Sequence, residues 1–220
     1  MLKHIIWDFN GTLLDDAWLC VQVLNILLRK RRMKKIDLES YKREFGFPVI
    51  DYYRHLGFTF ENETFDKVSI EYISLYNQRR HECSLQQGAR KALEDAKQWG
   101  LGQSVLSAYN QPYLENAIDH LGIRPFFARI LGLSDNYASS KVANGVRLLK
   151  ELGLQQDEAV LVGDTDHDLE TAQSMGIECI LTTSGHQGHD RLIRSGKPVC
   201  TGLDQVLSII RSRYAGTSIP

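Results

Sequence analysis

Short apolar runs alternate with amphipathic stretches along most of the chain. Runs typical of buried strands fall at residues 4–7, 103–107, 159–163, 177–181 and 199–200. Stretches with helical spacing lie at residues 89–99, 111–121, 142–152, 169–175 and 204–214. Strands that are apolar throughout and separated by helices are typical of parallel sheets covered on both faces. The pattern therefore predicts a doubly wound, Rossmann-like α/β core.

Residues 16–87 follow a different pattern. Apolar side chains recur at helical spacing from Trp18 to Leu28 and again from Tyr72 to Tyr76. We find no strand-like alternation in this stretch, so it is predicted to be an inserted, all-helical domain. The α/β core is then built from residues 1–15 and 88–220.

The composition is that of an ordinary globular protein. Of 220 residues, 43% are hydrophobic and 24% are charged, and 26 basic against 27 acidic side chains leave a net charge of −1. This balance gives no electrostatic basis for binding nucleic acid or an anionic membrane surface. A basic run at residues 29–35 holds six cations. We interpret it as a solvated helix end, because nothing else in the composition supports a nucleic-acid site.

The sequence carries no signal for export or membrane insertion. Its most apolar run, residues 17–28, is shorter than the about 20 residues that a spanning helix needs. Only three apolar residues, 5–7, directly precede the acidic Asp8, which does not fit a secretory signal. The four cysteines form no CxxC pair, which argues against a zinc site. We therefore expect a cytoplasmic protein with reduced cysteines.

Side chains with chemical potential follow three of the predicted strands. Asp8 follows the first, Ser107 ends another, and Asp164 and Asp168 follow a third, while Lys141 begins a helix. Because ligands of open parallel sheets bind at the carboxyl ends of strands, these residues are expected to meet in one crevice. Carboxylates gathered there repel one another unless a hard cation joins them. Mg²⁺ fits, since it prefers carboxylate, water and phosphate oxygens.

This set of motifs resembles that of the haloacid dehalogenase-like hydrolases. The motifs are Asp8-Phe-Asn-Gly-Thr-Leu-Leu-Asp15, Ser107, Lys141 and Gly163-Asp-Thr-Asp-His-Asp168, in the order of the family. The helical insertion after the first motif resembles the cap of the phosphoglycolate-phosphatase-like branch. The resemblance implies a magnesium-dependent phosphatase acting on a small phosphorylated metabolite, either phosphoglycolate-like or a sugar phosphate.

The resemblance also implies roles for the residues that react and bind metal. Asp8 is expected to be the nucleophile, which forms an aspartyl-phosphate that water then hydrolyses. Asp8, Asp164 and the backbone carbonyl of Asn10 are expected to bind Mg²⁺, with Asp168 bound directly or through water.

A second group is expected to bind the phosphate. Lys141 would neutralise its charge, while Ser107 and the nearby Gly11, Thr12 and Ala108 would hold its oxygens. Without the family context, Ser107 would read as an ordinary strand-end hydroxyl and Lys141 as a surface helix residue.

Asn10 departs from the family pattern, which has a second Asp at this position. That Asp protonates the leaving oxygen and later activates the hydrolytic water, and an amide can do neither in this pH range. Since general acid–base catalysis contributes about 10²–10⁴-fold, the loss is serious. We therefore expect activated aryl or acyl phosphates to react better than alkyl phosphates. A catalytically weakened protein that binds phosphometabolites or a protein partner is the alternative.

Dehalogenation is disfavoured, because that branch of the family needs no metal and no pair of metal carboxylates such as Asp164 and Asp168. The natural substrate and the oligomeric state are not encoded in any motif of the sequence.

Two loops have open interpretations. Phe45-Gly-Phe-Pro48, with Tyr52 and Arg54 nearby, resembles a cap loop that reaches over the substrate, or else it is ordinary helix packing with a solvated cation. His186 and His189 lie in a Gly-rich loop that borders the expected site, although a lone loop histidine is more often simply exposed.

Overall fold

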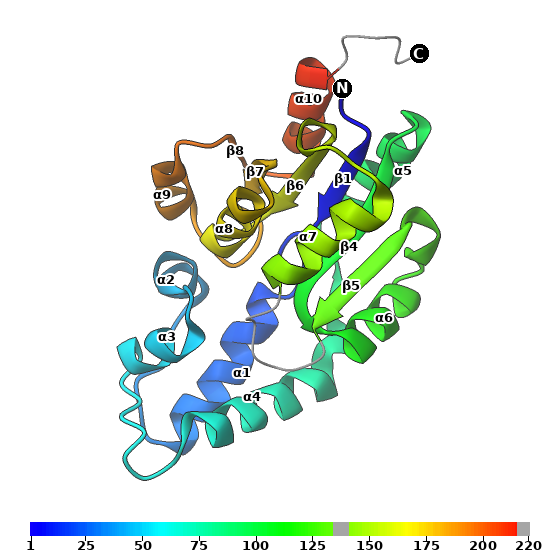
Figure 1. Ribbon diagram of the computed structural model, residues 1–220. Helices are drawn as coiled ribbons and strands as arrows, with labels where there is room; N and C mark the ends of the chain where they lie inside the picture. The colour runs from blue at the N-terminus through cyan, green and yellow to red at the C-terminus, as the bar shows by residue number, and fades with distance from the viewer. Residues whose placement is uncertain (134–140, 215–220) are drawn as a thin grey trace.

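The computed structural model describes residues 1–133 and 141–214 and shows a parallel sheet with helices on both faces (Figure 1). Across the sheet the strand order is β5-β4-β1-β6-β7-β8. In this order the strands span Arg129–Leu133, Gly102–Asn110, His4–Trp7, Ala159–Gly163, Glu178–Thr182 and Val199–Cys200. The predicted doubly wound α/β core is confirmed.

The central strand β1 shows why the strands are apolar at every position. Ile5 and Trp7 pack into one hydrophobic cluster with residues of α5, α6 and α10, whereas Ile6 packs into a second cluster with residues of α7 and α8. All three side chains are fully buried, so each face of the sheet requires its own apolar positions. The helices span Ala89–Gln98 (α5), Gln111–His120 (α6), Leu203–Tyr214 (α10), Lys141–Leu152 (α7) and Asp166–Met175 (α8).

Most predicted boundaries lie close to the observed ones, and two differ for physical reasons. Helix α8 begins at Asp166, three residues before the predicted start, because Thr165 and Asp168 form a capping box at its N-terminus. Strand β4 continues past residue 107 to Asn110, with a register shift against β5 between Leu106 and Asn110. Short helices complete the core at His189–Leu192 (α9), Arg124–Phe126, Gln156–Glu158 and Ile193–Ser195.

The sequence analysis missed strand β5. It lies at the edge of the sheet, where Arg129 is exposed, so its pattern lacks the continuous apolar run of the inner strands. It also contains Gly132, which reads as a turn signal. Here the glycine serves close packing, because a Cβ at this position would meet the backbone oxygen of Tyr109 at 2.5 Å.

Between the core segments, the chain forms helices joined to the core by a two-stranded ribbon. The helices span Ala17–Lys30 (α1), Leu38–Glu44 (α2), Val49–His55 (α3), Phe65–Arg79 (α4) and Arg80–Glu82. The antiparallel ribbon pairs β2 (Leu14–Asp15) with β3 (Ser84–Leu85). The insertion predicted as all-helical thus contains one short strand, β3. Its predicted limits, residues 16 and 87, stay a prediction.

Helices α1–α4 gather beyond the carboxyl ends of the sheet strands (Figure 1). The basic run at residues 29–35 ends α1, where Lys30 and Arg31 pair with Glu71 of α4 at 2.6 and 2.8 Å. This agrees with its interpretation as a helix end. Within residues 1–133 and 141–214, none of the helices combines the length and apolarity needed to span a bilayer.

Candidate active site

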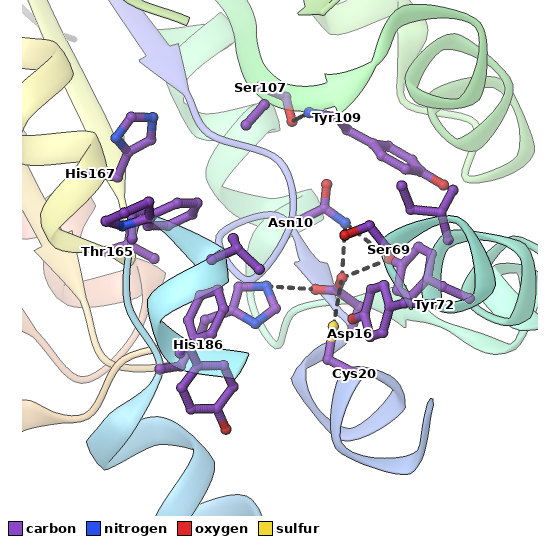
Figure 2. A pocket seen from close by; sticks show the side chains of 18 of the residues that line it. Asn10, Asp16, Cys20, Ser69, Tyr72, Ser107, Tyr109, Thr165, His167 and His186 are labelled. Atoms are coloured by element: carbon purple, nitrogen blue, oxygen red, sulfur yellow. Dashed lines mark hydrogen bonds and ion pairs between the residues drawn. The ribbon is translucent and has the colours of Figure 1, made fainter. Parts of the chain in front are cut away.

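Four charged residues meet at the carboxyl end of the sheet and form what we call the charged floor: Asp8, Lys141, Asp164 and Asp168. Asp8 follows β1, Asp164 follows β6, Asp168 lies in the first turn of α8, and Lys141 begins α7. All four line a cavity of about 730 Å³, whose other walls come partly from α1–α4. Figure 2 shows other residues of this lining, among them Asn10, Ser107 and His186. The convergence expected from the strand ends is what the structure shows.

Lys141 holds two of the carboxylates together. Its Nζ donates to Oδ1 of Asp8 at 2.7 Å and to Oδ1 of Asp168. Lys141 is 2% exposed, so it is not the surface helix residue that its position would indicate without the family context. Burial disfavours its charged form, but the two carboxylates outweigh this and keep its pKa above the usual value. Lys141 is therefore a buried cation.

The first turn of α8 fixes Asp168. Its Oδ2 accepts hydrogen bonds from the Thr165 hydroxyl at 2.7 Å and from the backbone N–H groups of Thr165 and Asp164 at 3.0 and 3.2 Å. Burial acts to raise its pKa, and Lys141 and Thr165 outweigh burial, so the pKa of Asp168 lies below its usual value. Asp168 stays ionised.

Asp164 is held from both sides. The Thr12 hydroxyl donates to its Oδ1 at 2.8 Å, and the backbone N–H of His186 donates to its Oδ2 at 2.6 Å. The backbone at Gly11 and at Gly185 lies so close to Asp164 that a Cβ at either position would meet Oδ2 of Asp164, at 2.3 and 2.1 Å respectively. Burial raises the pKa of Asp164 to about 6.

The charged floor fits a hard divalent cation. Asp8, Asp164 and Asp168 each offer a buried carboxylate oxygen, and these atoms lie within 4.8 Å of one another. One lysine does not balance three carboxylates, and burial raises the pKa of Asp8 well above its usual value. A cation would supply the missing positive charge, and an all-oxygen donor set suits Mg²⁺.

Asn10 faces the cavity next to the charged floor, and its side chain is fixed. Its Nδ2 donates to Oδ2 of Asp16 at 2.8 Å and to the Tyr76 hydroxyl oxygen at 3.0 Å. The amide nitrogen therefore points toward Asp16, and the amide oxygen points away from it, as Figure 2 shows.

Asp16 is the site residue that the sequence analysis missed. It is 1% exposed and accepts from Asn10, from the Tyr76 hydroxyl at 2.7 Å and from the Gly11 N–H at 2.9 Å. It precedes α1 at the N-cap position but makes no side-chain capping bond. The signal was an acidic residue directly before an apolar helix, which reads as an ordinary cap.

His186 is buried beside Asp16 rather than exposed. Its Nε2 lies 3.3 Å from Oδ1 of Asp16, and its Nδ1 lies 3.0 Å from the Tyr41 hydroxyl. Burial lowers the pKa of His186, but the carboxylates of Asp16 and Asp164 outweigh this and raise it to about 9. Burial acts to raise the pKa of Asp16, but His186 and Tyr76 outweigh burial, so this pKa lies below the usual value. The two residues form a buried ion pair.

The residues expected to hold phosphate fall into two groups. Ser107 and Ala108 line the cavity, and the Ser107 hydroxyl accepts from the backbone N–H of Tyr109 at 3.1 Å. Gly11 and Thr12 lie behind the cavity instead. The Gly11 N–H donates to Asp16, and the Thr12 hydroxyl donates to Asp164, so both buttress other site residues.

The loop at residues 45–48 also reaches the cavity. Phe45, Phe47 and Pro48 line it, as does Tyr52 of α3. Arg54 points away, is 60% exposed and pairs with Asp51 at 2.8 Å. His189 begins α9 and is exposed.

Comparisons with known proteins agree with this geometry. A family model described as haloacid dehalogenase-like hydrolase matches residues 5–182. The chain is 26% identical to a phosphoglycolate phosphatase of Rhodobacter capsulatus over 196 residues, which cover 85% of this chain and 87% of that one. It is also 26% identical to the tyrosine-protein kinase PtkA of Mycobacterium tuberculosis over 199 residues, 90% of this chain and 67% of the kinase.

Solved structures share the fold. A conserved haloacid dehalogenase-like protein of unknown function from Agrobacterium tumefaciens superimposes with a TM-score of 0.81 at 21% identity, covering 98% of this chain and all of that one. A predicted phosphatase from Clostridium acetobutylicum superimposes with a TM-score of 0.80 at 19% identity, covering 96% and 99% of the two chains. The resemblance drawn from the motifs is confirmed.

Proposed function

The chain belongs to the haloacid dehalogenase-like hydrolase family, and we propose that it hydrolyses small phosphate monoesters through a phosphoenzyme formed on Asp8. The observation that carries this proposal is the ion pair of Lys141 with Asp8 and Asp168 on the floor of the cavity. A buried cation beside Asp8 would offset negative charge when this carboxylate attacks a phosphate dianion, which supports the proposal.

We assign the metal to the charged floor. Asp8, Asp164, Asp168 and the backbone carbonyl of Asn10 would hold Mg²⁺, as the resemblance implied. When bound, the ion offsets the negative charge that the substrate phosphate brings to the carboxylates. Thr12 and the N–H of His186 orient Asp164 for this role, and Thr165 orients Asp168.

The reaction then has two steps. The Asp8 carboxylate attacks phosphorus, and the ester oxygen leaves with the electron pair of the broken P–O bond. Lys141 neutralises charge on the transferring group, and the Ser107 hydroxyl and the Ala108 amide bind its oxygens. Water next attacks the aspartyl-phosphate, releases inorganic phosphate and regenerates Asp8.

Asn10 sets the limit of this chemistry. Its amide nitrogen already donates to Asp16 and Tyr76, and it carries no proton that it can transfer. The same feature favours the second candidate, a protein that binds a phosphometabolite and turns it over poorly. A cap formed by residues 16–87 and a cytoplasmic location remain predictions from the sequence.

The test is turnover and trapping on the whole chain with Mg²⁺. Wild-type protein should hydrolyse acetyl phosphate and phenyl phosphate, and acid quenching should trap one phosphoryl group on the peptide that contains Asp8. Asp8→Asn should abolish both signals. Asp51→Asn, which removes an exposed carboxylate from α3, serves as the matched control. Phosphorylation that persists in Asp8→Asn would refute the assignment, and binding of phosphate esters without turnover would favour the second candidate.

A further inference from the structure

The substrate-binding part of the cavity is built mainly from rings. Eight of the described lining rings come from the insertion, and five of these form what we call the aromatic wall: Phe45, Phe47, Tyr52, Tyr72 and Tyr76. Phe45 packs edge-on against Phe47 and Tyr52, with ring centroids 5.5 and 5.3 Å apart. At about 730 Å³ the cavity lies within the range of about 300–1,000 Å³ found for small-molecule sites. Its lining suits an aromatic ligand.

The described lining of the cavity offers no unpaired lysine or arginine to a second anionic group. Among the described residues that line it, Lys141 is the one lysine or arginine, and it is already paired with Asp8 and Asp168. Of the two lining histidines, His186 is paired with Asp16. Nδ1 of His167 lies 3.5 Å from Glu170, and its buried Nε2 has no hydrogen-bond partner among the described residues. The undescribed residues 134–140 contain no Lys, Arg or His in their sequence. A carboxylate on the substrate would meet no free lysine or arginine there, whereas six carboxylates already line the cavity, so burying another negative charge is costly.

One polar atom of the aromatic wall is available. Tyr52 is only 4% exposed, and its buried hydroxyl has no hydrogen-bond partner among the described residues. Burial raises the pKa of Tyr52 above its usual value, so the hydroxyl is neutral and offers a hydrogen bond to an uncharged polar group.

Asn10 also favours an aromatic substrate, because of the leaving group that such a substrate provides. Without an acid at this position, the ester oxygen departs unprotonated, which favours alcohols of low pKa. A phenol, like tyrosine, has a pKa of about 10. An aliphatic hydroxyl, like bulk water, has a much higher pKa. The aromatic wall and Asn10 thus favour the same substrates for independent reasons, one through binding and the other through reactivity.

We propose that the substrates of this site are phosphate monoesters of phenols that carry no second anionic group. The inference rests on the proposed function, because it takes Asp8 as the nucleophile. It excludes two-carbon phosphoacids, which leave the aromatic wall unfilled and place a carboxylate beside it.

The experiment compares five phosphate compounds on the whole chain with Mg²⁺. Phenyl phosphate is the reference, 4-carboxyphenyl phosphate adds a charge, cyclohexyl phosphate removes the aromatic leaving group, and 2-phosphoglycolate does both. Acetyl phosphate reports Asp8 chemistry without needing the aromatic wall. We expect kcat/KM for phenyl phosphate to exceed that for 4-carboxyphenyl phosphate at least 10-fold, mostly through KM. It should exceed that for cyclohexyl phosphate at least 100-fold, mostly through kcat.

A matched pair of variants on α4 tests the missing charge directly. Ser69 lines the cavity, whereas Ser74 on the same helix is exposed and does not line it. Ser69→Arg should raise kcat/KM for 4-carboxyphenyl phosphate relative to phenyl phosphate at least 10-fold. Ser74→Arg makes the same chemical change outside the cavity and should leave the ratio as in the wild type.

The outcomes separate the two proposals. Turnover of acetyl phosphate with equal or better use of 4-carboxyphenyl phosphate or 2-phosphoglycolate overturns the substrate class and leaves the proposed function standing. An equal response of the ratio to Ser69→Arg and Ser74→Arg likewise overturns it. Failure to turn over acetyl phosphate and every ester overturns the proposed function, and the substrate class with it.

Discussion

The charged floor and the aromatic wall enclose the same cavity but are built in different ways. The charged floor comes from the ends of β1 and β6 and the first residues of α7 and α8, and its side chains are held by hydrogen bonds to Lys141, to hydroxyl groups and to backbone N–H groups. The aromatic wall comes from α3, α4 and the loop at residues 45–48, and its rings contact one another mainly through their faces and edges. Under the proposed function, this difference assigns reactivity and selectivity to separate parts of the chain, so that we expect each to be changed without the other.

The largest effect is expected on the charged floor. Asp164→Ala removes one of three clustered carboxylates, and we expect Mg²⁺ affinity measured by calorimetry to fall by more than about 100-fold, since indirect partners alone contribute about 10–100-fold. Turnover should fall with it. Asp157→Ala, at an exposed carboxylate, is the control. Unchanged Mg²⁺ affinity in Asp164→Ala would show that the metal lies elsewhere.

Restoring an acid beside the charged floor should have the next largest effect. Asn10→Asp should raise kcat for cyclohexyl phosphate by about 10²-fold or more, the usual contribution of a positioned acid–base group. The gain for phenyl phosphate should be smaller, because its leaving group needs less protonation. Asn10 precedes Gly11, and Asn-Gly sequences deamidate, so mass spectrometry of this peptide must accompany the kinetics. Equal rates for intact wild type and variant would mean that another residue supplies the acid.

A change in the aromatic wall should act on binding instead. Phe47→Ala removes a ring that lies 4.7 Å from the ring of His167, and we expect KM for phenyl phosphate to rise about 10-fold with kcat nearly unchanged, as for a loss of uniform binding. Phe126→Ala, a ring outside the cavity, provides the comparison. A drop in kcat at constant KM would contradict the separation of the two regions.

The smallest expected effect is on the stability of the folded protein, and it comes from the ion pair of His186 and Asp16 in the same cavity. His186 pairs with Asp16, and its pKa is about 9 in the folded protein against 6.5 for the free side chain. The folded state binds this proton more tightly, so the stabilisation is complete below pH 6.5 and is lost as pH rises through 9. It amounts to about 3 kcal/mol at most.

Thermal unfolding in EDTA between pH 6 and 10 measures this loss. The wild type should lose stability across this window, whereas His186→Gln should be less stable at pH 6 and change less as pH rises. Parallel curves for the two proteins would show that the pair does not titrate as described.

The sequence predicted the charged floor better than the aromatic wall. Asp8, Asp164 and Asp168 lie next to apolar strands, and parallel strands bring their carboxyl ends together whatever the rest of the chain does. Strand β5 was not predicted, because an edge strand buries only part of its surface and its hydrophobic pattern is therefore weak. The core was otherwise predictable to within a few residues at each boundary.

The hydrogen-bond partners of Asn10 could not be predicted from the sequence, for a different reason. Tyr76 lies 66 residues away, and its hydroxyl meets Asn10 only because α1 and α4 pack together. The burial of His186 depends in the same way on Tyr41 of α2. Contacts between distant helices leave no local pattern, so a tyrosine at helical spacing reads simply as core.

The place of β1 in the sheet has a consequence for the order in which the protein is made. Its neighbours pair with it through Gly102 and Ala159, so the strand that precedes Asp8 is synthesised well before either partner strand. At about 5–20 residues per second, roughly 100 residues take about 5–20 s to synthesise. The last residue of α4, Arg79, is added before Gly102, so all the residues of α1–α4 are joined to the chain while β1 still lacks both partners. The helices that line the cavity are therefore synthesised before the apolar strand beneath it has a sheet to join.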